Sequence, residues 1–538
     1  MTMIFPIIPF IFHILFSAHA SELAQTLPDS APCDYIYGGF INQSYPYPAA
    51  DYIGIPKDYR VVRDVVRDFG ADNTGTQCAS AAIQRAINAG GERGPSRSTT
   101  SYGTTGKPAV VYFPQGTYLM DGSIQLYAGT VLIGDLRMHN FYIGMKNLVI
   151  DSVDVDPGRE LTLLDWTLSQ ATLLENVVFN MAKNSSHRGI STWYEFNSNI
   201  IVLGQGSWRL VKSVASTSAA NTLVLDNIVN DGVTLEVEGE AIITGNIENM
   251  FLRGSKARIW FNATSVYAPR SLPLIQDGKY LTLNPPSLID LRCRSYAQST
   301  QDWEGSGTGF NDDTWHINRR LAWAAKTGSL LYWPAGIYTV TNTIYIPAGL
   351  RLVGDPFATV ILAKGDNFKD PDNPKPVVQV GEPGEKGSLL MSDFIISVAE
   401  PLPGAKLLEV SLSPDDTSEP VHIRNVHFRV GGSLGTTLRT GTNCTENAAS
   451  CPAAWCLLHL APSSGAYIKN MWGWTADHDL DRPTFGSILI STGRRALIES
   501  TNPTWLIGTG FEHNTLYQYN FHGAKDVFMA TGMRRAEL

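Results

Sequence analysis

The chain has 538 residues, of which 43% are hydrophobic and 17% are charged, and this balance excludes an intrinsically disordered protein. Its formal net charge of −9 at pH 7 argues against nucleic acid as a partner, because an acidic surface repels phosphate. The 48 glycines, 21 tyrosines and 12 tryptophans suit a large β protein with many turns.

Residues 1–20 are predicted to be a signal peptide. The apolar run from Ile4 to Phe16 is shorter than the roughly 20 residues of a membrane span. Ser17–Ala20 then supply the small residues that precede a cleavage site. We therefore expect a secreted protein, extracellular or in the cell wall, that has no membrane contact after cleavage. Residues 21–60 would form an N-terminal arm.

One sequence unit occurs twice in the chain. Residues 112–135 and 332–355 align without a gap, and such self-similarity is the signature of repeat architectures. A short helix is predicted upstream of each copy, followed by a buried strand and a Pro-x-Gly-x-Tyr turn, in which glycine supplies backbone angles that other residues avoid. The apolar positions are Ala82, Ile83, Ala86, Ile87 and Val110–Phe113 in the first copy, and Ile317, Leu321, Ala324 and Leu330–Trp333 in the second.

Short apolar strands separated by polar turns follow each copy. Several carry an asparagine before an alternating run, and asparagine supports tight turns. The pattern predicts the coils of a parallel β-helix, in which each repeat contacts only its neighbours. The alternative is a β-sandwich, whose hairpins would need Asn-Gly or Asp-Gly pairs, and these are scarce here. The asparagines are Asn147, Asn176, Asn425 and Asn470.

We therefore predict an all-β fold of two tandem right-handed parallel β-helices, each opened by a short capping helix. The first helix covers residues 61–264 and the second covers residues 305–538. Residues 265–304 are rich in proline and lack periodicity, so they are predicted to be a linker.

Two acidic segments are candidate catalytic and binding sites. Inverting glycoside hydrolysis needs two carboxyl groups about 6.5–9.5 Å apart, and we predict Glu512 and Asp479 for these roles. On an extended strand, Asp477, Asp479 and Asp481 would share one side, beside rings that can stack on sugars. The alternative is a solvated loop or a structural network with Arg482. The predicted substrate-binding residues are Trp472, Trp474, Asp477, Asp481, Gln170 and Gln518.

Glu512 and His513 are also adjacent in sequence, as a proton-transfer pair would require. Neighbours on a strand point to opposite faces, however, so the two side chains need not touch.

Six cysteines fit an oxidising compartment. Cys444 and Cys451 are close enough in sequence to close one small disulfide loop, while Cys33 and Cys78 could tie the N-terminal arm to the first helix. The cysteine spacing fits no zinc pattern, so no metal site is predicted. Candidate glycosylation sequons start at Asn42, Asn184, Asn262 and Asn443.

Several segments resemble the fungal glucan 1,3-β-glucosidases (exo-β-1,3-glucanases) of glycoside hydrolase family 55, within the pectate-lyase-type, rhamnogalacturonase/epimerase-like superfamily. The resemblance implies two β-helices side by side, with sugar bound in the cleft between them. It also implies exo-acting, inverting hydrolysis of β-1,3-glucan to glucose, with no metal or organic cofactor. The most specific segments are YIKNMWGWTADHDLD (467–481) and TWLIGTGFEHNTLYQYNF (504–521); FYIGMKNLVID (141–151) and SQATLLENVVFNM (169–181) also match.

The chain departs from that family pattern in two places. After Ser191 it passes directly to GQGSWRLVKS (204–213), where family members have further coils. It stops at Leu538, and the resemblance places the acidic catalytic residue beyond that point. We therefore expect an incomplete second helix and a poor catalyst. Two other functions stay open: a pectin- or rhamnogalacturonan-active enzyme, or a non-catalytic glucan-binding protein. In each case we expect a monomer.

Overall fold

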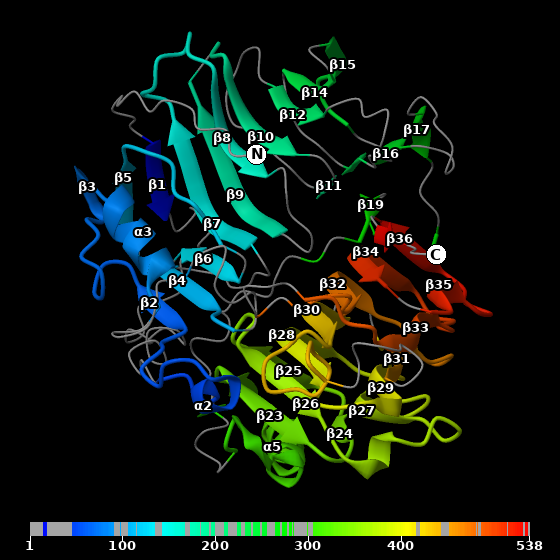
Figure 1. Cartoon of the computed structure of the whole chain (residues 1–538). Coiled ribbons are helices and arrows are strands. Elements are labelled where there is room, and N and C mark those ends of the chain that lie inside the picture. Colours follow the sequence, from blue (N-terminus) through cyan, green and yellow to red (C-terminus); the bar gives the residue numbers. More distant parts are fainter. Residues whose placement is uncertain are drawn as a thin grey trace.

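The computed structural model consists almost entirely of strands, arranged in two halves (Figure 1). The first half, blue to green, lies above the second half, yellow-green to red, in this view. The structure describes residues 14–18, 46–90, 97, 106–192 with short breaks, separate strands and turns between 195 and 299, 305–530 with breaks at 416–419, 443–450, 480, 482–485 and 514, and 533–535.

The first half holds the strands up to the predicted linker. In chain order its elements are β1 (Ile14–Ala18), α2 (Ala50–Ile53), β2 (Val62–Asp64), β3 (Thr74–Cys78), α3 (Ser80–Asn88), β4 (Ala109–Phe113), β5 (Gly116–Met120), β6 (Thr130–Gly134), β7 (Ile143–Ser152), β8 (Leu161–Trp166), β9 (Leu173–Met181), β10 (His187–Thr192), β11 (Glu195–Ser198), β12 (Arg209–Ser213), β13 (Leu223–Asp226), β14 (Val233–Val237), β15 (Glu240–Thr244), β16 (Met250–Gly254), β17 (Thr264–Ala268), β18 (Ile275–Gln276) and β19 (Lys279–Tyr280).

The second half holds the longer and more regular strands. Its elements are β20 (Gln298–Ser299), β21 (Thr308–Asp312), α5 (Thr314–Thr327), β22 (Leu330–Trp333), β23 (Gly336–Val340), β24 (Ile344–Ile346), β25 (Leu350–Gly354), β26 (Thr359–Ala363), η2 (Asp366–Phe368), β27 (Lys375–Val380), β28 (Leu389–Val398), β29 (Leu402–Val410), β30 (Val421–Val430), β31 (Pro452–Leu460), β32 (Tyr467–Thr475), β33 (Ser491–Ile498), β34 (Thr504–Glu512), β35 (Tyr517–Phe521), β36 (Val527–Ala530) and β37 (Met533–Arg535).

The second half is a parallel β-helix. One sheet runs in the order β22–β25–β28–β30–β32–β34–β36 and a second sheet in the order β24–β27–β29–β31–β33–β35, with parallel pairing throughout both runs. Every residue of β28 and β30 is buried, as expected for strands that stack into one continuous core. Its first strand, β20, comes from residues that were assigned to the linker.

The predicted duplication is confirmed by the strand registers. In the first half Tyr112 pairs with Ile133, and in the second half Tyr332 pairs with Val353, at the same offset. The helices α3 and α5 precede the two copies, and the predicted apolar positions of both helices are buried.

The Pro-x-Gly-x-Tyr turns also match between the two copies. The hydroxyl of Tyr118 donates to the Pro114 carbonyl at 2.6 Å, and the hydroxyl of Tyr338 donates to the Pro334 carbonyl at 3.0 Å. A side chain at Gly116 would collide with the Asn73 backbone in the preceding coil. The turn therefore needs glycine because the two coils approach closely.

The asparagines lie inside long strands rather than before them. Asn425 and Asn470 have positive φ angles of 49° and 52°, so each bends its strand in the middle. The Asn470 amide donates to Asn425 Oδ1 at 2.8 Å, and the Asn425 amide donates to Asp393 Oδ1 at 3.1 Å. The predicted position in a turn before each strand is therefore wrong, although these asparagines do bend the chain, and their side chains form a hydrogen-bonded ladder across successive coils.

The first half is less regular than the second. Strands β8, β10, β12 and β14 pair in parallel, but β15 pairs antiparallel with β14, and β16 pairs antiparallel with β13 and β17. The predicted parallel helix therefore does not continue unchanged to residue 264. Strand β1, from the segment predicted to be a signal peptide, pairs antiparallel with β5 and β7.

The N-terminal arm and the linker both contact the second half. The Tyr52 hydroxyl donates to the Gly435 carbonyl at 2.8 Å, whereas the Tyr59 hydroxyl donates to Pro108 of the first half at 2.6 Å. From the linker, Leu274 accepts a hydrogen bond from the buried Trp505 indole at 3.0 Å. These contacts join the two halves through segments outside the coils.

Candidate active site

The two acidic segments lie on neighbouring coils of the second helix. Strand β32 ends just before Asp477, and β34 ends at Glu512. The parallel register pairs Trp474 with Glu512. Residues 35 or more positions apart in the sequence are thereby placed one coil apart, about 4.8 Å in the hydrogen-bonding direction. At the next coil, the backbone of Arg535 in β37 takes the register position beside Glu512.

Glu512 is a buried carboxylate that is only partly satisfied. Its side chain is 2% exposed, and its Oε1 accepts no hydrogen bond within the described part of the chain. Its Oε2 lies 3.5 Å from His513 Nε2. Because a buried acceptor without a partner is costly, this oxygen can receive a substrate hydroxyl or a water.

His513 bridges two carboxylates. Strand β34 ends at Glu512 and His513 has a φ of 62°, so its side chain turns back instead of pointing to the opposite face. Its Nε2 lies 3.5 Å from Glu512 Oε2 and 3.8 Å from Asp477 Oδ2. The Glu512–His513 contact left open by the sequence is therefore present.

Asp477 connects this buried pair to solvent. Its side chain is 40% exposed, and its Oδ1 lies 2.6 Å from Nδ1 of the half-exposed His478. The four groups form a continuous series of carboxylates and imidazoles from the core to the surface. Such a series can move a proton between a buried acid and water.

Asp479 and Asp481 have a different environment from Asp477. Both are buried, because the chain leaves the strand after Thr475 and residues 476–479 bend instead of continuing it. The prediction that the three aspartates share one side of a strand is therefore wrong. Asp479 accepts the Thr440 N–H at 3.2 Å, and Asp481 accepts the Leu434 N–H at 3.1 Å.

Asp481 also forms a fully buried ion pair. Its Oδ2 lies 3.2 Å from Nη2 of Arg429, and the two side chains are 2% and 1% exposed. A structural Asp–Arg network was one alternative for this segment, with Arg482 as the partner. Arg482 lies outside the described residues, and the observed partner is Arg429. These contacts favour a role for Asp479 and Asp481 in holding the surrounding loop.

Trp472 and Trp474 lie in the core. Their rings stack on each other, with 5.5 Å between the ring centroids and an interplanar angle of 13°, and both side chains are buried. The His478 and Trp474 rings pack edge to face, with 5.3 Å between their centroids. The predicted role of these rings as open platforms for sugar does not fit this packing, which supports the strand beneath Asp477 and Glu512 instead.

A buried arginine was missed by the sequence analysis. Arg495 of β33 is fully buried, and none of its three guanidinium nitrogens has a hydrogen-bond partner within the described residues. Burial lowers the pKa of Arg495 to about 9, and the nearby charge of Glu512 opposes this effect. Period-two reasoning could not have identified it, because Arg495 and Ala496 are consecutive buried residues in β33, whereas Arg494 is only partly buried.

The remaining predicted site residues are only partly placed. Gln518 is buried in β35, whereas Gln170 lies outside the described residues. Asn184 is exposed in a turn; the other sequons, at Asn42, Asn262 and Asn443, lie outside the described part.

The cysteines leave one expectation untested and correct another. Cys451 is disulfide-bonded, while Cys444, its predicted partner, lies outside the described residues. Cys78 is an exposed free thiol, so the predicted tie between Cys33 and Cys78 is wrong. Within the described ranges, no group of three or more His, Cys, Asp or Glu side chains could hold a metal ion. The same ranges contain no helix long and apolar enough to cross a membrane.

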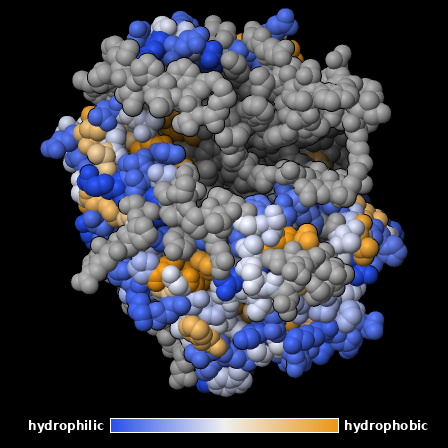
Figure 2. All heavy atoms as spheres, viewed as in Figure 1, coloured by the Kyte–Doolittle hydropathy of each residue, from blue (hydrophilic) through white to orange (hydrophobic). Residues whose placement is uncertain are grey.

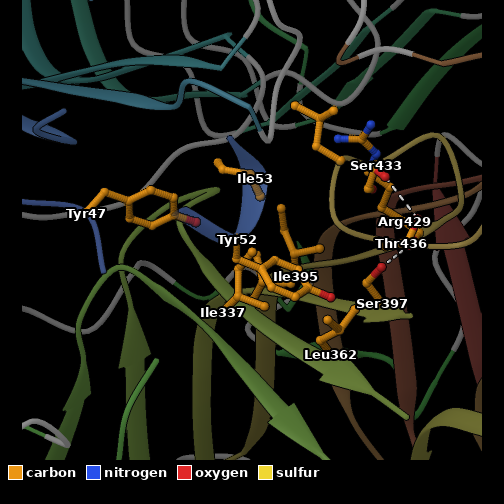
Figure 3. A pocket seen from close by; sticks show the side chains of 12 residues that line it. Tyr47, Tyr52, Ile53, Ile337, Leu362, Ile395, Ser397, Arg429, Ser433 and Thr436 are labelled. Atoms are coloured by element: carbon orange, nitrogen blue, oxygen red, sulfur yellow. Dashed lines mark hydrogen bonds between the residues drawn. The ribbon is translucent and has the colours of Figure 1, made fainter. Parts of the chain in front are cut away.

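A small pocket lies between the N-terminal arm and the second helix (Figure 3). Tyr47, Tyr52 and Ile53 of the arm face Ile337 and Arg429 across it. Its open volume is about 30 Å³, enough for a water but far below the roughly 300 Å³ of a ligand site. Figure 2 shows that the described surface is mostly hydrophilic, with separate hydrophobic patches.

Comparisons with known proteins give a consistent picture. The family model described as "Rhamnogalacturonase A/epimerase, pectate lyase-like" matches residues 62–139, 136–250 and 298–378. A "Glucan 1,3-beta-glucosidase" from Cochliobolus carbonum is 30% identical over 88% of this chain and 75% of its own length. That alignment runs over 601 residues, more than this chain contains, so the relative holds internal segments that this chain lacks.

Other relatives carry related and unrelated names. The "Glucan endo-1,3-beta-glucosidase BGN13.1" from Trichoderma harzianum is 25% identical over 90% of this chain and 77% of its own. A "Non-secreted LysM effector LysM15" from Penicillium expansum is 26% identical over 90% of this chain and 43% of its own. Among solved structures, sacteLam55A from Streptomyces sp. SirexAA-E covers 88% of this chain and 85% of its own, with 13% identity and a TM-score of 0.39.

Proposed function

This chain belongs to the rhamnogalacturonase A/epimerase, pectate lyase-like family, in the branch of the glucan 1,3-β-glucosidases of glycoside hydrolase family 55, and from this premise we propose that it hydrolyses β-1,3-glucan. The observation that carries the proposal is the Glu512–His513–Asp477 arrangement, in which a buried carboxylate is linked to a partly exposed one. The substrate is a polysaccharide, and the site of action is the cell wall or the extracellular space.

Glu512 and Asp477 are close enough to act as a pair of catalytic carboxyl groups. His513 Nε2 lies 3.5 Å from one carboxylate oxygen and 3.8 Å from the other, so the two oxygens are at most about 7.3 Å apart. This bound admits the lower part of the range of about 6.5–9.5 Å that inverting glycosidases use, and it also admits the roughly 5–5.5 Å of retaining ones; the family resemblance favours inversion. Glu512 and Asp477 therefore replace the sequence-based pair of Glu512 and Asp479.

The roles of the two groups follow from their surroundings. Glu512 is buried at the end of β34, in register with Trp474 of the neighbouring coil, and we assign it the role of the acid that donates to the leaving oxygen. Asp477 is open to solvent and can activate water. His513 and His478 orient the two carboxylates, while Asp479 positions the loop through Thr440.

Exo-acting release of glucose is the second part of the proposal. Relatives carry both "1,3-beta-glucosidase" and "endo-1,3-beta-glucosidase" names, so the product pattern decides between the two modes. Purified protein is incubated with laminarin, and products are separated over time. Glucose as the first product supports exo action, whereas a ladder of oligosaccharides from the start supports endo action.

Variants test the carboxylates directly. Glu512→Gln and Asp477→Asn should each lower laminarin turnover by about 10²–10⁴-fold, with folding unchanged by circular dichroism. The exposed Glu382→Gln is the matched control. Turnover that survives both site variants would reject this pair. Glucan binding without turnover in the parent protein would favour a binding protein, and release from polygalacturonate or rhamnogalacturonan alone would favour a pectin-active enzyme.

A further inference from the structure

The two halves differ at one position in their stacks. In the second half, β26 lies between β23 and the end of β28 and pairs in parallel with both. In the first half, the corresponding place between β5 and β7 is taken by β1, which pairs with both strands in antiparallel orientation. Figure 1 shows β1, in dark blue, beside β5.

Chain length explains the difference. In the second half, Leu350 of β25 and its partner Leu389 of β28 are 39 residues apart, and the intervening chain forms β26, η2 and β27. In the first half, Thr130 of β6 and its partner Ile143 of β7 are only 13 residues apart. Eight residues between β6 and β7 are too few to supply both missing strands, so β5 and β7 need a strand from elsewhere in the chain.

The register of β1 reproduces that of β26. Ile361 of β26 is paired with Tyr338 and Ile396. Phe16 of β1 is paired with Tyr118 and Ile150, which are the equivalent residues of the first half. Tyr118 and Ile150 are fully buried, so this register position requires an apolar residue.

An empty slot would be costly. Strands β5 and β7 would each present unpaired backbone N–H and C=O groups along the slot. Open strand edges of this kind also invite pairing with other chains. The sequence ILFSA of residues 14–18 suits this place, because it is short and mostly apolar and contains no proline that would interrupt the pairing.

We propose that the first β-helix has a strand-acceptor slot between β5 and β7, and that residues 14–18 of the same chain fill it. The apolar N-terminal segment is then a structural strand of the folded protein. This assignment competes with the predicted signal peptide, because cleavage after Ala20 would remove the strand.

Cross-linking tests the register. In the full chain with Cys78→Ser, the double variant Ser17→Cys/Thr117→Cys joins two residues that are paired across β1 and β5. Oxidation should join these cysteines within one molecule in most of the sample, as shown by peptide mapping. The matched control Ser17→Cys/Asp121→Cys places the second thiol beyond the end of β5 and should not cross-link.

Truncation tests the consequence. A chain that starts at Ser21 should be cut in the first half by protease at least tenfold faster than the full chain, with cutting of the second half unchanged. A synthetic peptide of residues 12–20 should restore protection, and a scrambled peptide should not.

Three results would overturn the proposal. They are absence of the Ser17–Thr117 cross-link, a cross-link that forms only between molecules, and a naturally produced protein that starts near Ser21 with a first half as protected as that of the full chain. None of these readouts depends on glucan hydrolysis, so the proposed function can fail or hold independently.

Discussion

Removing Arg429 should destabilise the second helix more than any exposed charge change. Its guanidinium pairs with Asp481 at 3.2 Å, and both side chains are almost fully buried. An Arg429→Met variant keeps most of the apolar volume but leaves the Asp481 carboxylate buried and uncompensated. Breaking a buried pair in this way costs about 3–5 kcal/mol, a large part of the roughly 5–15 kcal/mol that stabilises a typical domain.

Guanidinium unfolding monitored by intrinsic fluorescence measures this loss, because Trp474 lies beside Arg429. The double variant Arg429→Met/Asp481→Asn should regain more than about 1 kcal/mol, since a neutral amide still accepts the Leu434 N–H. Lys57→Met, which breaks an exposed pair with Asp51, is the control and should change stability by less than about 0.5 kcal/mol. A loss below about 1 kcal/mol in Arg429→Met, or no recovery in the double variant, would refute this reasoning.

Three further predictions concern pH and backbone packing. Burial raises the pKa of Glu409, but hydrogen bonds, chiefly from His459, outweigh this effect and hold the pKa at about 2. The free energy of unfolding should therefore fall as the pH drops from about 4.3 toward 2. Glu409→Gln should remove this loss in acid denaturation curves. Burial raises the pKa of Asp355 to about 6, so its contribution has the opposite sign: stability falls as the pH rises from about 4 to 6, and an Asp355→Asn variant with an unchanged slope would contradict this. Gly116→Ala should cost about 1–3 kcal/mol through overpacking, whereas Gly122→Ala, with open space around it, should be neutral in thermal unfolding; equal effects would show that the coils can separate.

The repeat made most of the fold predictable. The carbonyl groups of Pro114 and Pro334 accept equivalent hydrogen bonds from Tyr118 and Tyr338. The constant spacing between these residues is visible in the amino-acid sequence. The apolar positions of α3 and α5 were predictable for a similar reason, since period 3.6 marks one buried face. A structural unit that occurs twice in one chain can be detected from a single sequence, because its residues recur at a constant spacing.

The irregular parts of the fold left no such signal. The antiparallel pairing of β16 with β13 and β17 depends on which strand edges meet in space. The position of β1 depends on a length difference between the halves, because β5 and β7 lack the strand that β26 supplies in the second half. Neither feature produces a periodic pattern within its own segment.

The candidate site shows why carboxylates are hard to rank from sequence. Asp477, Asp479 and Asp481 look equivalent if the segment is an extended strand, because they share period two. The bend after β32 gives each a different environment: Asp477 faces solvent and His478, whereas the other two accept backbone N–H groups in the core. Their roles are decided by contacts with Thr440, Leu434 and Arg429, which are distant in sequence.

One backbone angle completes the site. On a regular strand the side chains of Glu512 and His513 would lie on opposite faces of the sheet. The φ of 62° at His513 turns the imidazole back, so that it reaches both Glu512 and Asp477. Positive φ values are uncommon for residues other than glycine and cost free energy unless the surroundings enforce them. Because strain of this kind concentrates at functional sites, the geometry of His513 is independent support for placing the chemistry at the end of β34.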